Sequence, residues 1–194
     1  EAMAEWLFAL LDAAGVEKAA LVGHSMSSLV ALDAAGRAPE RTTRLVMVGT
    51  AYPMKVSPAL LDLSRADPLA AIDMVTMLSY STLAAKPGYP GPGVWTRGGG
   101  KALCRLVLAH QGDALLYHRD FLACDSYQGG LAAAAKVTAP ASLILGVRDQ
   151  MTVPKAATEI GTALKARIER VEAGHVLMAE APDAVLNALR RSLS

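Results

Sequence analysis

The sequence predicts an α/β domain: a mostly parallel sheet with helices on both faces and a helical cap inserted into it. Short apolar runs of strand length alternate with helical patterns, an order that usually produces parallel pairing. This alternation stops after residue 50 and resumes near residue 131, and no convincing strand lies between. We therefore expect a core formed by residues 1–50 and 131–194, and a cap formed by residues 51–130.

The first part of the core predicts two helices and two strands. Residues 19–23 and 45–48 are apolar runs typical of buried strands. Residues 26–35 have helical composition, and we expect Gly36 to end that helix. A helix is also predicted at the start of the chain, because apolar residues recur there at offsets of three and four. They are Met3, Trp6, Leu7, Leu10, Leu11 and Ala14.

The sequence of the insertion predicts two helices, over residues 58–80 and 103–122, with a loop between them. Residues 86–100 form that loop, because they are crowded with Pro and Gly. The alternating pattern then resumes with a short helix, a strand, a helix, a strand and a final amphipathic helix. Their predicted ranges are 131–136, 142–146, 155–165, 168–171 and 183–193, with Pro154 placed to start the middle helix.

Composition limits the possible partners and location. The 194 residues carry 19 basic and 18 acidic side chains without a basic stripe, so we expect neither nucleic acid nor a membrane surface as partner. No apolar run reaches the ~18 residues needed to span a bilayer, and residues 1–15 lack the basic region of a signal peptide. Cys104 and Cys124 fit no disulfide or metal motif. We expect a cytoplasmic protein with reduced thiols.

The strongest chemical signal is the run LVGHSMSS at residues 21–28. It follows an apolar strand and opens an apolar helix, the setting in which a nucleophile elbow lifts a serine out of the sheet. Ser25 is the candidate nucleophile, and the N–H of Met26 is a candidate oxyanion donor. The usual motif is G-x-S-x-G, and Ser27 stands in place of its second glycine. We expect the fold to absorb this small intrusion.

A serine nucleophile needs a general base, and the base needs an acid that orients it. Asp149 follows the strand at 142–146, and His175 follows the strand at 168–171. The carboxyl ends of parallel strands share one edge, so we expect Ser25, Asp149 and His175 to converge there.

Other residues of the same types are weaker candidates. Asp120 and Asp125 lie in the insertion, and His110 and His118 lie on a helical pattern, where surface or hydrogen-bonded histidines are common. His24 is expected to line the site or pack beneath it. Arg148 beside the candidate acid is read as a solvated or structural arginine and not as a substrate clamp.

Three segments together resemble the α/β-hydrolase superfamily: GHSM at 23–26, LGVRD at 145–149, and GHVL at 174–177 followed by EAP at 180–182. The likeness is greatest to small esterases, haloperoxidase-like enzymes and carbon–carbon-bond hydrolases. A serine nucleophile argues against haloalkane dehalogenases and epoxide hydrolases. The resemblance implies a Ser-His-Asp triad that needs no metal or cofactor, and a helical cap in the middle of the chain.

The chain departs from the family at its beginning. Glu1 lies inside a helical pattern, whereas family members have several strands before that helix. The loop that supplies a second oxyanion N–H lies among those strands, so we expect a fold that lacks its N-terminal strands. The first strand would then be an exposed edge through which the chain could self-associate.

The sequence therefore predicts an esterase of the carboxylic-ester hydrolase class that acts through an acyl-Ser25 intermediate on a small, apolar ester. His24, Met54, Met77 and Trp95 are candidate substrate-binding residues. Two alternatives stay open at this point. The chain could be a non-catalytic binder of a small ligand, or a hydrolase fragment that is active only with its missing N-terminal part.

Overall fold

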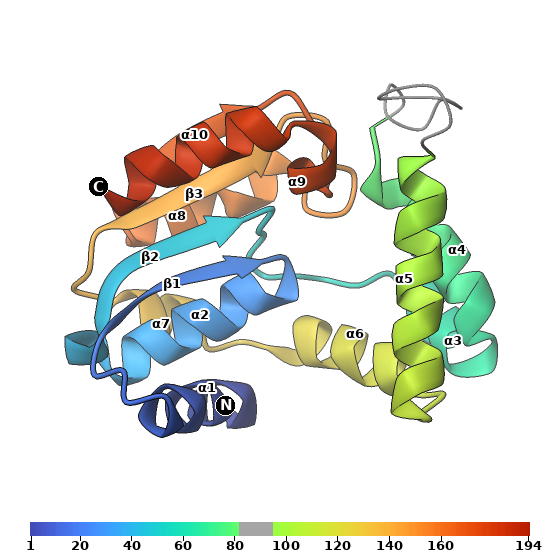
Figure 1. The fold of residues 1–194 in the computed structure, drawn as a ribbon, viewed down its shortest axis with the longest axis horizontal. Helices are drawn as coiled ribbons and strands as arrows, with labels where there is room; N and C mark the ends of the chain where they lie inside the picture. The colour runs from blue at the N-terminus through green and yellow to red at the C-terminus, as the bar shows by residue number, and fades with distance from the viewer. Residues whose placement is uncertain (82–94) are drawn as a thin grey trace.

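The computed structural model describes residues 1–81 and 95–194, whose core is a four-stranded parallel sheet (Figure 1). The strands lie side by side in chain order: β1 (Ala19–His24), β2 (Thr42–Val48), β3 (Ala141–Gly146) and β4 (Arg167–Val171). Each neighbouring pair is parallel. The carboxyl ends of the strands therefore share one edge, and the predicted parallel sheet is confirmed.

Both faces of the central strands are buried. Successive side chains of a strand point to opposite faces, so Leu45 and Met47 of β2 join one apolar core while Val46 and Val48 join the other. These four side chains are at most 3% exposed. Burial on both sides explains why the strands read as continuous apolar runs and not as alternating ones.

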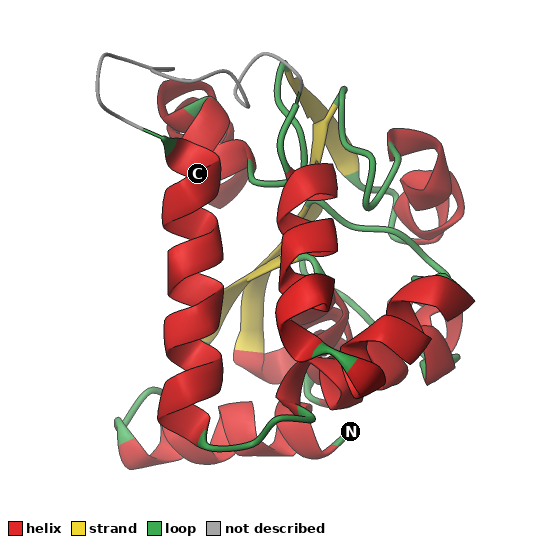
Figure 2. Cartoon of the chain, turned by 90° about the vertical axis from the view of Figure 1, so that its right-hand side faces the viewer, coloured by secondary structure: helices red, strands yellow, loops and turns green. Residues whose placement is uncertain are grey.

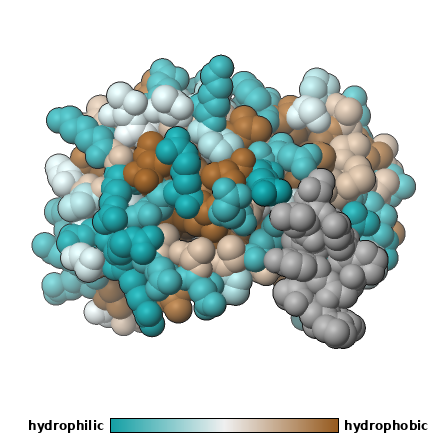
Figure 3. Space-filling model, turned by 90° about the horizontal axis from the view of Figure 1, so that it is seen from above, coloured by the Kyte–Doolittle hydropathy of each residue, from teal (hydrophilic) through white to brown (hydrophobic). Residues whose placement is uncertain are grey.

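Helices cover the two faces unequally (Figure 1). One core lies beneath α2 (Met26–Arg37), α7 (Gly130–Ala134) and α8 (Thr158–Ala163), and α1 (Ala2–Ala13) packs against α2. The other core lies beneath α9 (Leu177–Glu180) and α10 (Pro182–Leu193). Two 3₁₀ turns, η1 (Pro39–Arg41) and η2 (Pro154–Ala157), complete the core. Figure 3 views the molecule from above, the side on which α10 lies. This surface is largely hydrophilic, with apolar side chains gathered near its middle.

Four helices stand between β2 and β3 in the chain, and we call them the inserted helices. They are α3 (Pro58–Ala66), α4 (Pro68–Ser79), α5 (Thr96–Gln111) and α6 (Leu116–Ser126). In Figure 1 the strand arrows point toward them, and Figure 2 views the molecule from their side, with the sheet behind. The inserted helices thus stand beside the edge formed by the carboxyl ends of the strands, where the candidate site residues lie.

Each of the two long helices predicted in the insertion is divided. Asp67 follows the last residue of α3 and caps the start of α4, where its Oδ1 accepts the Ala70 N–H at 3.0 Å. Pro68 cannot continue the preceding helix, because proline has no N–H to donate. Gly112, at φ +64°, ends α5. The predicted loop at 86–100 is wrong from Thr96 onward, where α5 begins, and residues 86–94 lie outside the described residues.

The prediction that Gly36 ends its helix is also wrong. Gly36 lies inside α2, which continues to Arg37. A Cβ on Gly36 would lie 2.8 Å from the Cα of Ala133, so the glycine serves the close approach of α2 to α7. The predicted helix at 155–165 is divided in a similar way, into η2 and the shorter α8.

The apolar stripe of α1 is only partly covered. Ala4 is buried against the core and Leu7 and Phe8 pack beside it, whereas Trp6 is 65% exposed. Within the described residues β1 pairs with β2 alone, and a groove between α1 and β1 follows its open edge. No helix in the described ranges is both long and apolar enough to cross a membrane.

Candidate active site

Ser25 occupies a sharp turn between β1 and α2. Its φ is +53°, a left-handed conformation that is costly for a residue with a Cβ. The Ser25 N–H donates to the carbonyl of Val48 at 2.9 Å, which ties the turn to β2. Gly23 allows α2 to start so close to β1, because a Cβ there would lie 2.1 Å from the Ser27 carbonyl oxygen. This strained strand–turn–helix geometry is that of a nucleophile elbow.

The serines that follow Ser25 have different environments. The side chain of Ser27 is exposed and lines the groove beside β1, so its hydroxymethyl group has open space. Ser28 is fully buried; its hydroxyl donates to the Ser25 carbonyl at 2.5 Å and hydrogen-bonds the Thr50 hydroxyl at 2.7 Å. Sequence reasoning missed the part played by Ser28 and Thr50, which hold the elbow from below.

The structure brings Ser25, His175 and Asp149 into one chain of hydrogen bonds. Nε2 of His175 lies 2.9 Å from Ser25 Oγ, and Nδ1 lies 2.8 Å from Asp149 Oδ2. Asp149 follows β3 and His175 follows β4, so the shared sheet edge positions both. An ionised carboxylate only accepts hydrogen bonds; Nδ1 therefore carries the proton, and Nε2 presents its lone pair to the serine hydroxyl.

Asp149 is held by more than the histidine. Its side chain is fully buried, and its Oδ1 accepts the N–H groups of Met151 and Thr152, each at 2.8 Å. The Thr152 hydroxyl donates to Oδ2 at 2.7 Å. Burial alone would raise the pKa of Asp149, but its bonds to His175 and Thr152 outweigh burial and lower that pKa. Thr152 was not predicted, although an Asp followed by a hydroxyl residue three positions later is a turn signal.

The loop that carries His175 is fastened to the end of α4. The N–H groups of His175 and Val176 donate to the Ser79 carbonyl at 2.8 and 3.1 Å. The carboxylate of Glu180 accepts the N–H of Gly174 at 3.1 Å, the N–H of Ser81 at 3.0 Å and the Ser81 hydroxyl. We call this set of bonds the Glu180 joint. It couples the inserted helices to the backbone of the candidate base.

His24 packs beside His175. Their ring centroids lie 4.7 Å apart, and His24 Nε2 donates to the His175 carbonyl at 2.8 Å. Burial lowers the pKa of His24, and the positive charge of a protonated His175 lowers it further. His24 is therefore a neutral ring that supports the candidate base, and it does not line the cavity described next.

A cavity of about 380 Å³ lies between the elbow and the inserted helices. Ser25 and Met26 line it from the core side. Met26 is the first residue of α2, where a backbone N–H has no partner within the helix. Most of the other lining side chains are apolar: Met54, Val56, Leu60, Leu78, Phe121, Cys124 and Met151. Of the predicted substrate-binding residues, Met54 is in this lining.

Met77 and Trp95 are not in this lining, which corrects their predicted placement. Their side chains are 56% and 52% exposed. Adjacent residues on a helix point in directions about 100° apart, so Leu78 faces the cavity and Met77 faces solvent. Trp95 precedes α5 and packs over Gly98 and near the guanidinium of Arg97.

Three of the weaker candidates, Asp125, His118 and Arg148, have structural partners, whereas His110 is exposed on α5. Asp125 accepts the Val56 N–H at 3.1 Å, and Arg148 pairs with the exposed Glu172 at 3.3 Å. The ring of His118 lies 3.0 Å from the hydroxyl of Ser64. Asp120 lines the cavity that contains Ser25. Both cysteines are free thiols.

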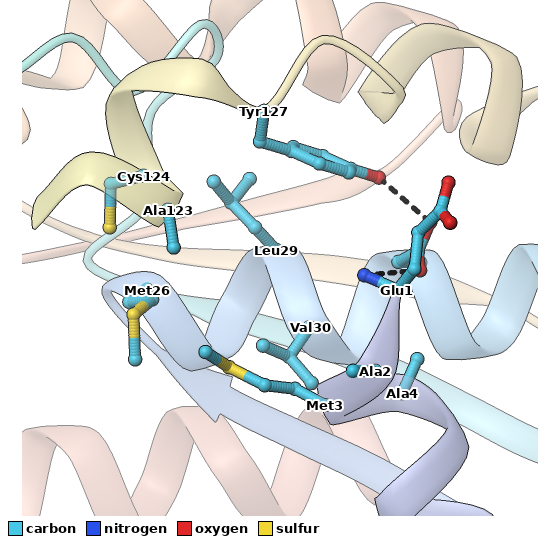
Figure 4. Close-up of a pocket in the computed structure, with 11 residues that line it drawn as sticks. Glu1, Ala2, Met3, Ala4, Met26, Leu29, Val30, Ala123, Cys124 and Tyr127 are labelled. Atoms are coloured by element: carbon cyan, nitrogen blue, oxygen red, sulfur yellow. Dashed lines mark hydrogen bonds and ion pairs between the residues drawn. The ribbon is translucent and has the colours of Figure 1, made fainter. Parts of the chain in front are cut away.

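A second, smaller cavity of about 190 Å³ lies behind the elbow, between α1, α2 and the end of α6 (Figure 4). Met26 and Cys124 line both cavities, and the Tyr127 hydroxyl donates to Asp33 at 3.2 Å across the small one. Neither Ser25 nor His175 reaches it.

Comparisons with known proteins agree with this fold. A family model described as "Alpha/beta hydrolase family" matches residues 1–188. The enol-lactonase from Burkholderia xenovorans LB400 is similar, with a TM-score of 0.82 and 22% identity over 98% of this chain and 71% of that chain. A thermophilic esterase has a TM-score of 0.77 and 24% identity, covering 98% of this chain and 72% of its own. An esterase from Exiguobacterium antarcticum has a TM-score of 0.80 and 15% identity, over 97% and 71% of the two chains. At these identities the likeness establishes the fold.

Proposed function

The chain belongs to the alpha/beta hydrolase family, and we propose that it cleaves an ester or related acyl bond through an acyl-Ser25 intermediate. The observation that carries the proposal is the unbroken chain of hydrogen bonds from Ser25 through His175 to Asp149. A serine hydroxyl is a weak nucleophile by itself. A histidine that faces it through an unprotonated nitrogen, with a buried carboxylate behind, supplies the base that the reaction needs.

In the first half of the proposed reaction, Ser25 Oγ attacks the substrate carbonyl while His175 Nε2 takes the hydroxyl proton. The imidazolium that forms is stabilised by Asp149, whose lowered pKa keeps it ionised at neutral pH. The carbonyl oxygen becomes an oxyanion, and we propose that the N–H of Met26, at the start of α2, donates to it. His175 then gives its proton to the leaving alcohol, and the carbon–oxygen bond of the ester breaks.

In the second half, water replaces the alcohol. His175 removes a proton from the water, which attacks the acyl carbon, and the proton returns to Ser25 Oγ as the acid leaves. These steps use protein groups alone. The family resemblance implies a second oxyanion N–H from strands that precede the first helix in other members, and we propose that full activity needs such a donor.

The cavity supports a small-molecule substrate. Its volume of about 380 Å³ falls in the range of about 300–1,000 Å³ that is usual for ligand pockets. Methionines at 54 and 151 and leucines at 60 and 78 line it, and such side chains adapt to apolar acyl groups of varied shape. We propose that the inserted helices act as the cap that closes the cavity over the substrate.

Rapid-mixing kinetics with p-nitrophenyl esters of increasing acyl length test the proposal. An acyl-enzyme predicts a burst of p-nitrophenol whose amplitude follows the enzyme concentration, if deacylation is the slower half. Ser25→Ala should lower kcat/KM by a factor of about 10⁴ or more, since the nucleophile itself is removed.

Ser27→Ala is the matched control, because it removes the same hydroxyl two residues away on an exposed side chain. It should retain kcat/KM within about twofold. A Ser25→Ala variant that folds and keeps most of its activity would contradict the proposal. So would a wild-type protein that binds these esters without cleaving any of them, which would favour a ligand-binding role.

A further inference from the structure

The cavity at Ser25 contains a carboxylate that has no partner among the residues the structure describes. Asp120, on α6, lines this cavity together with Ser25 and Met26. Within the described ranges its side chain has no hydrogen bond and no ion pair, whereas Asp113 and Asp125 near the two ends of the same helix have both. A half-buried carboxylate that nothing compensates is unusual, because desolvation penalises its charge.

Among the described residues, no nearby group neutralises Asp120. Desolvation raises its pKa, as expected for a carboxyl that lacks a compensating charge. The cavity also contains Lys55, but its ammonium donates to the Asp125 carbonyl at 2.8 Å and faces the Asp125 carboxylate at 3.7 Å. Cys124, one turn further along α6, is a neutral thiol: burial raises its pKa to about 11, and the charge of Asp120 acts in the same direction.

Two aromatic residues of α6 share the cavity with the carboxylate. Tyr117 and Phe121 line the same cavity, and their rings are stacked with centroids 6.4 Å apart. The Tyr117 hydroxyl donates to the carbonyl of Cys104 at 3.0 Å, so it is not turned toward Asp120 as a donor. The face of an aromatic ring attracts cations electrostatically, and that attraction adds to the charge of a neighbouring carboxylate.

We propose that Asp120, Tyr117 and Phe121 form a cation subsite, and that the preferred substrate is an ester bearing a quaternary ammonium group. This inference rests on the proposed acyl-Ser25 hydrolysis, because the subsite shares its cavity with Ser25. Asp120 is thereby a specificity-determining residue: it attracts cationic esters and repels those that carry a carboxylate.

The apolar lining selects the type of cation. A primary ammonium group is compact and strongly hydrated, and most side chains that line this cavity are apolar and cannot replace its water. A quaternary ammonium group hides its charge under methyl groups, which suit the methionines and aromatic rings of the lining. The subsite should therefore discriminate by charge between groups of equal shape.

Two pairs of isosteric esters test this. On the acyl side, p-nitrophenyl 4-(trimethylammonio)butanoate is compared with p-nitrophenyl 5,5-dimethylhexanoate. On the alcohol side, 2-(trimethylammonio)ethyl butanoate is compared with 3,3-dimethylbutyl butanoate. In at least one pair the cationic ester should have a kcat/KM about tenfold higher. Ratios near one in both pairs would overturn the proposal.

The Asp120→Asn variant connects the preference to this carboxylate. It should lower the cationic-to-neutral ratio to about one or two, and this ratio is the readout whatever the change in kcat/KM for the neutral ester. Asp62→Asn makes the same change on the exposed surface of α3, outside the cavity, and should leave the ratio unchanged. An unchanged ratio in Asp120→Asn, or an equal fall in Asp62→Asn, would contradict the assignment.

These measurements separate this inference from the proposed function. Turnover of the neutral esters reports the proposed hydrolysis, and the ratio reports the subsite. Binding of butyltrimethylammonium to the Ser25→Ala protein, measured by calorimetry, does not depend on turnover at all. It should weaken about tenfold when Asp120→Asn is added; equal binding by both proteins would overturn the subsite even in an active enzyme.

Discussion

At the scale of single residues, the neutral ring of His24 links the active site to stability. Burial lowers its pKa in the folded protein, whereas the unfolded chain keeps the ordinary value of about 6.5. As the pH falls from 7 to 5, the unfolded state therefore takes up a proton more readily than the folded state. The free energy of unfolding decreases over this window, because stability falls wherever the unfolded state binds more protons.

Replacing His24 with Gln should remove this contribution. The Gln amide can still donate to the His175 carbonyl but does not titrate, so the fall in Tm between pH 7 and pH 5 should become smaller. Thermal unfolding followed by circular dichroism at several pH values measures it. His110→Gln, at an exposed position on α5, is the control and should leave the profile as in the wild type. A His24→Gln profile parallel to the wild type would show that the ring does not carry this dependence.

Sequence reasoning could identify residues whose chemistry depends on a local pattern. Ser25 follows a strand and opens a helix, and Asp149 and His175 each follow a strand, so motif and order were enough to propose these three residues. Thr152 and Glu180 were not found, because their roles come from contacts. Glu180 bonds Ser81, 99 positions earlier in the chain, and no periodicity records such a pairing. Asp120 was named in the sequence only as a weaker acid candidate, since its place in the cavity depends on how the inserted helices pack.

At the scale of elements, the Glu180 joint connects the inserted helices to the loop of the candidate base, His175. The carboxylate accepts hydrogen bonds from both sides: from Gly174, beside His175, and from Ser81, beyond α4. A Gln in its place keeps one acceptor oxygen and loses the other. We expect Glu180→Gln to lower stability by about 1–3 kcal/mol, the usual effect of breaking a hydrogen bond to a charged group.

The same variant should also affect catalysis. Loosening the joint lets the His175 loop move away from Ser25, so kcat should fall about tenfold while KM changes less. Steady-state kinetics with a neutral ester measure the two constants. Glu172→Gln lies in the same loop on an exposed side chain paired with Arg148, and it should keep both kcat and Tm close to the wild type. Equal effects of the two variants would mean that the joint has no special role.

The element boundaries show where sequence patterns reach their limit. All four strands were predicted to within three residues, and burial on both faces leaves continuous apolar runs in β2 and β3. The two long helices predicted over residues 58–80 and 103–122 are each divided in the structure. Asp67 with Pro68 divides the first and Gly112 ends α5, but the helical pattern in the sequence is compatible with either a break or a continuous helix at these positions. Gly36 was wrongly predicted to end its helix. A glycine is needed at this position because α2 lies close to Ala133 on α7, a contact that the local sequence does not reveal.

At the scale of the whole molecule, the open edge of β1 lies beside an exposed apolar face of α1. Trp6, Met3 and Leu10 are 65%, 41% and 49% exposed. Within the described residues one edge of β1 has no strand beside it, and such an edge next to an apolar surface favours association with another chain. Self-association through this edge stays a prediction. Trp6→Lys should shift the protein toward the monomer without unfolding it, because the side chain is mostly outside the core.

Sedimentation velocity over a range of concentrations measures this shift. Trp95→Lys is the matched control, since Trp95 is also more than half exposed but lies far along the chain, at the start of α5. It should leave the distribution of species unchanged. A wild-type protein that remains monomeric at all concentrations, or an equal shift in both variants, would show that this edge does not mediate association.

The central claim is that Ser25 is a nucleophile activated by His175 and Asp149, and labelling with a fluorophosphonate probe tests it most directly. The probe reacts with activated serines and leaves ordinary hydroxyls alone. Peptide mass spectrometry should locate a single adduct on Ser25 in the wild-type and Ser27→Ala proteins, and the adduct should disappear in Ser25→Ala and weaken strongly in His175→Ala. A folded wild-type protein that is not labelled, or that is labelled on another residue, would contradict the claim.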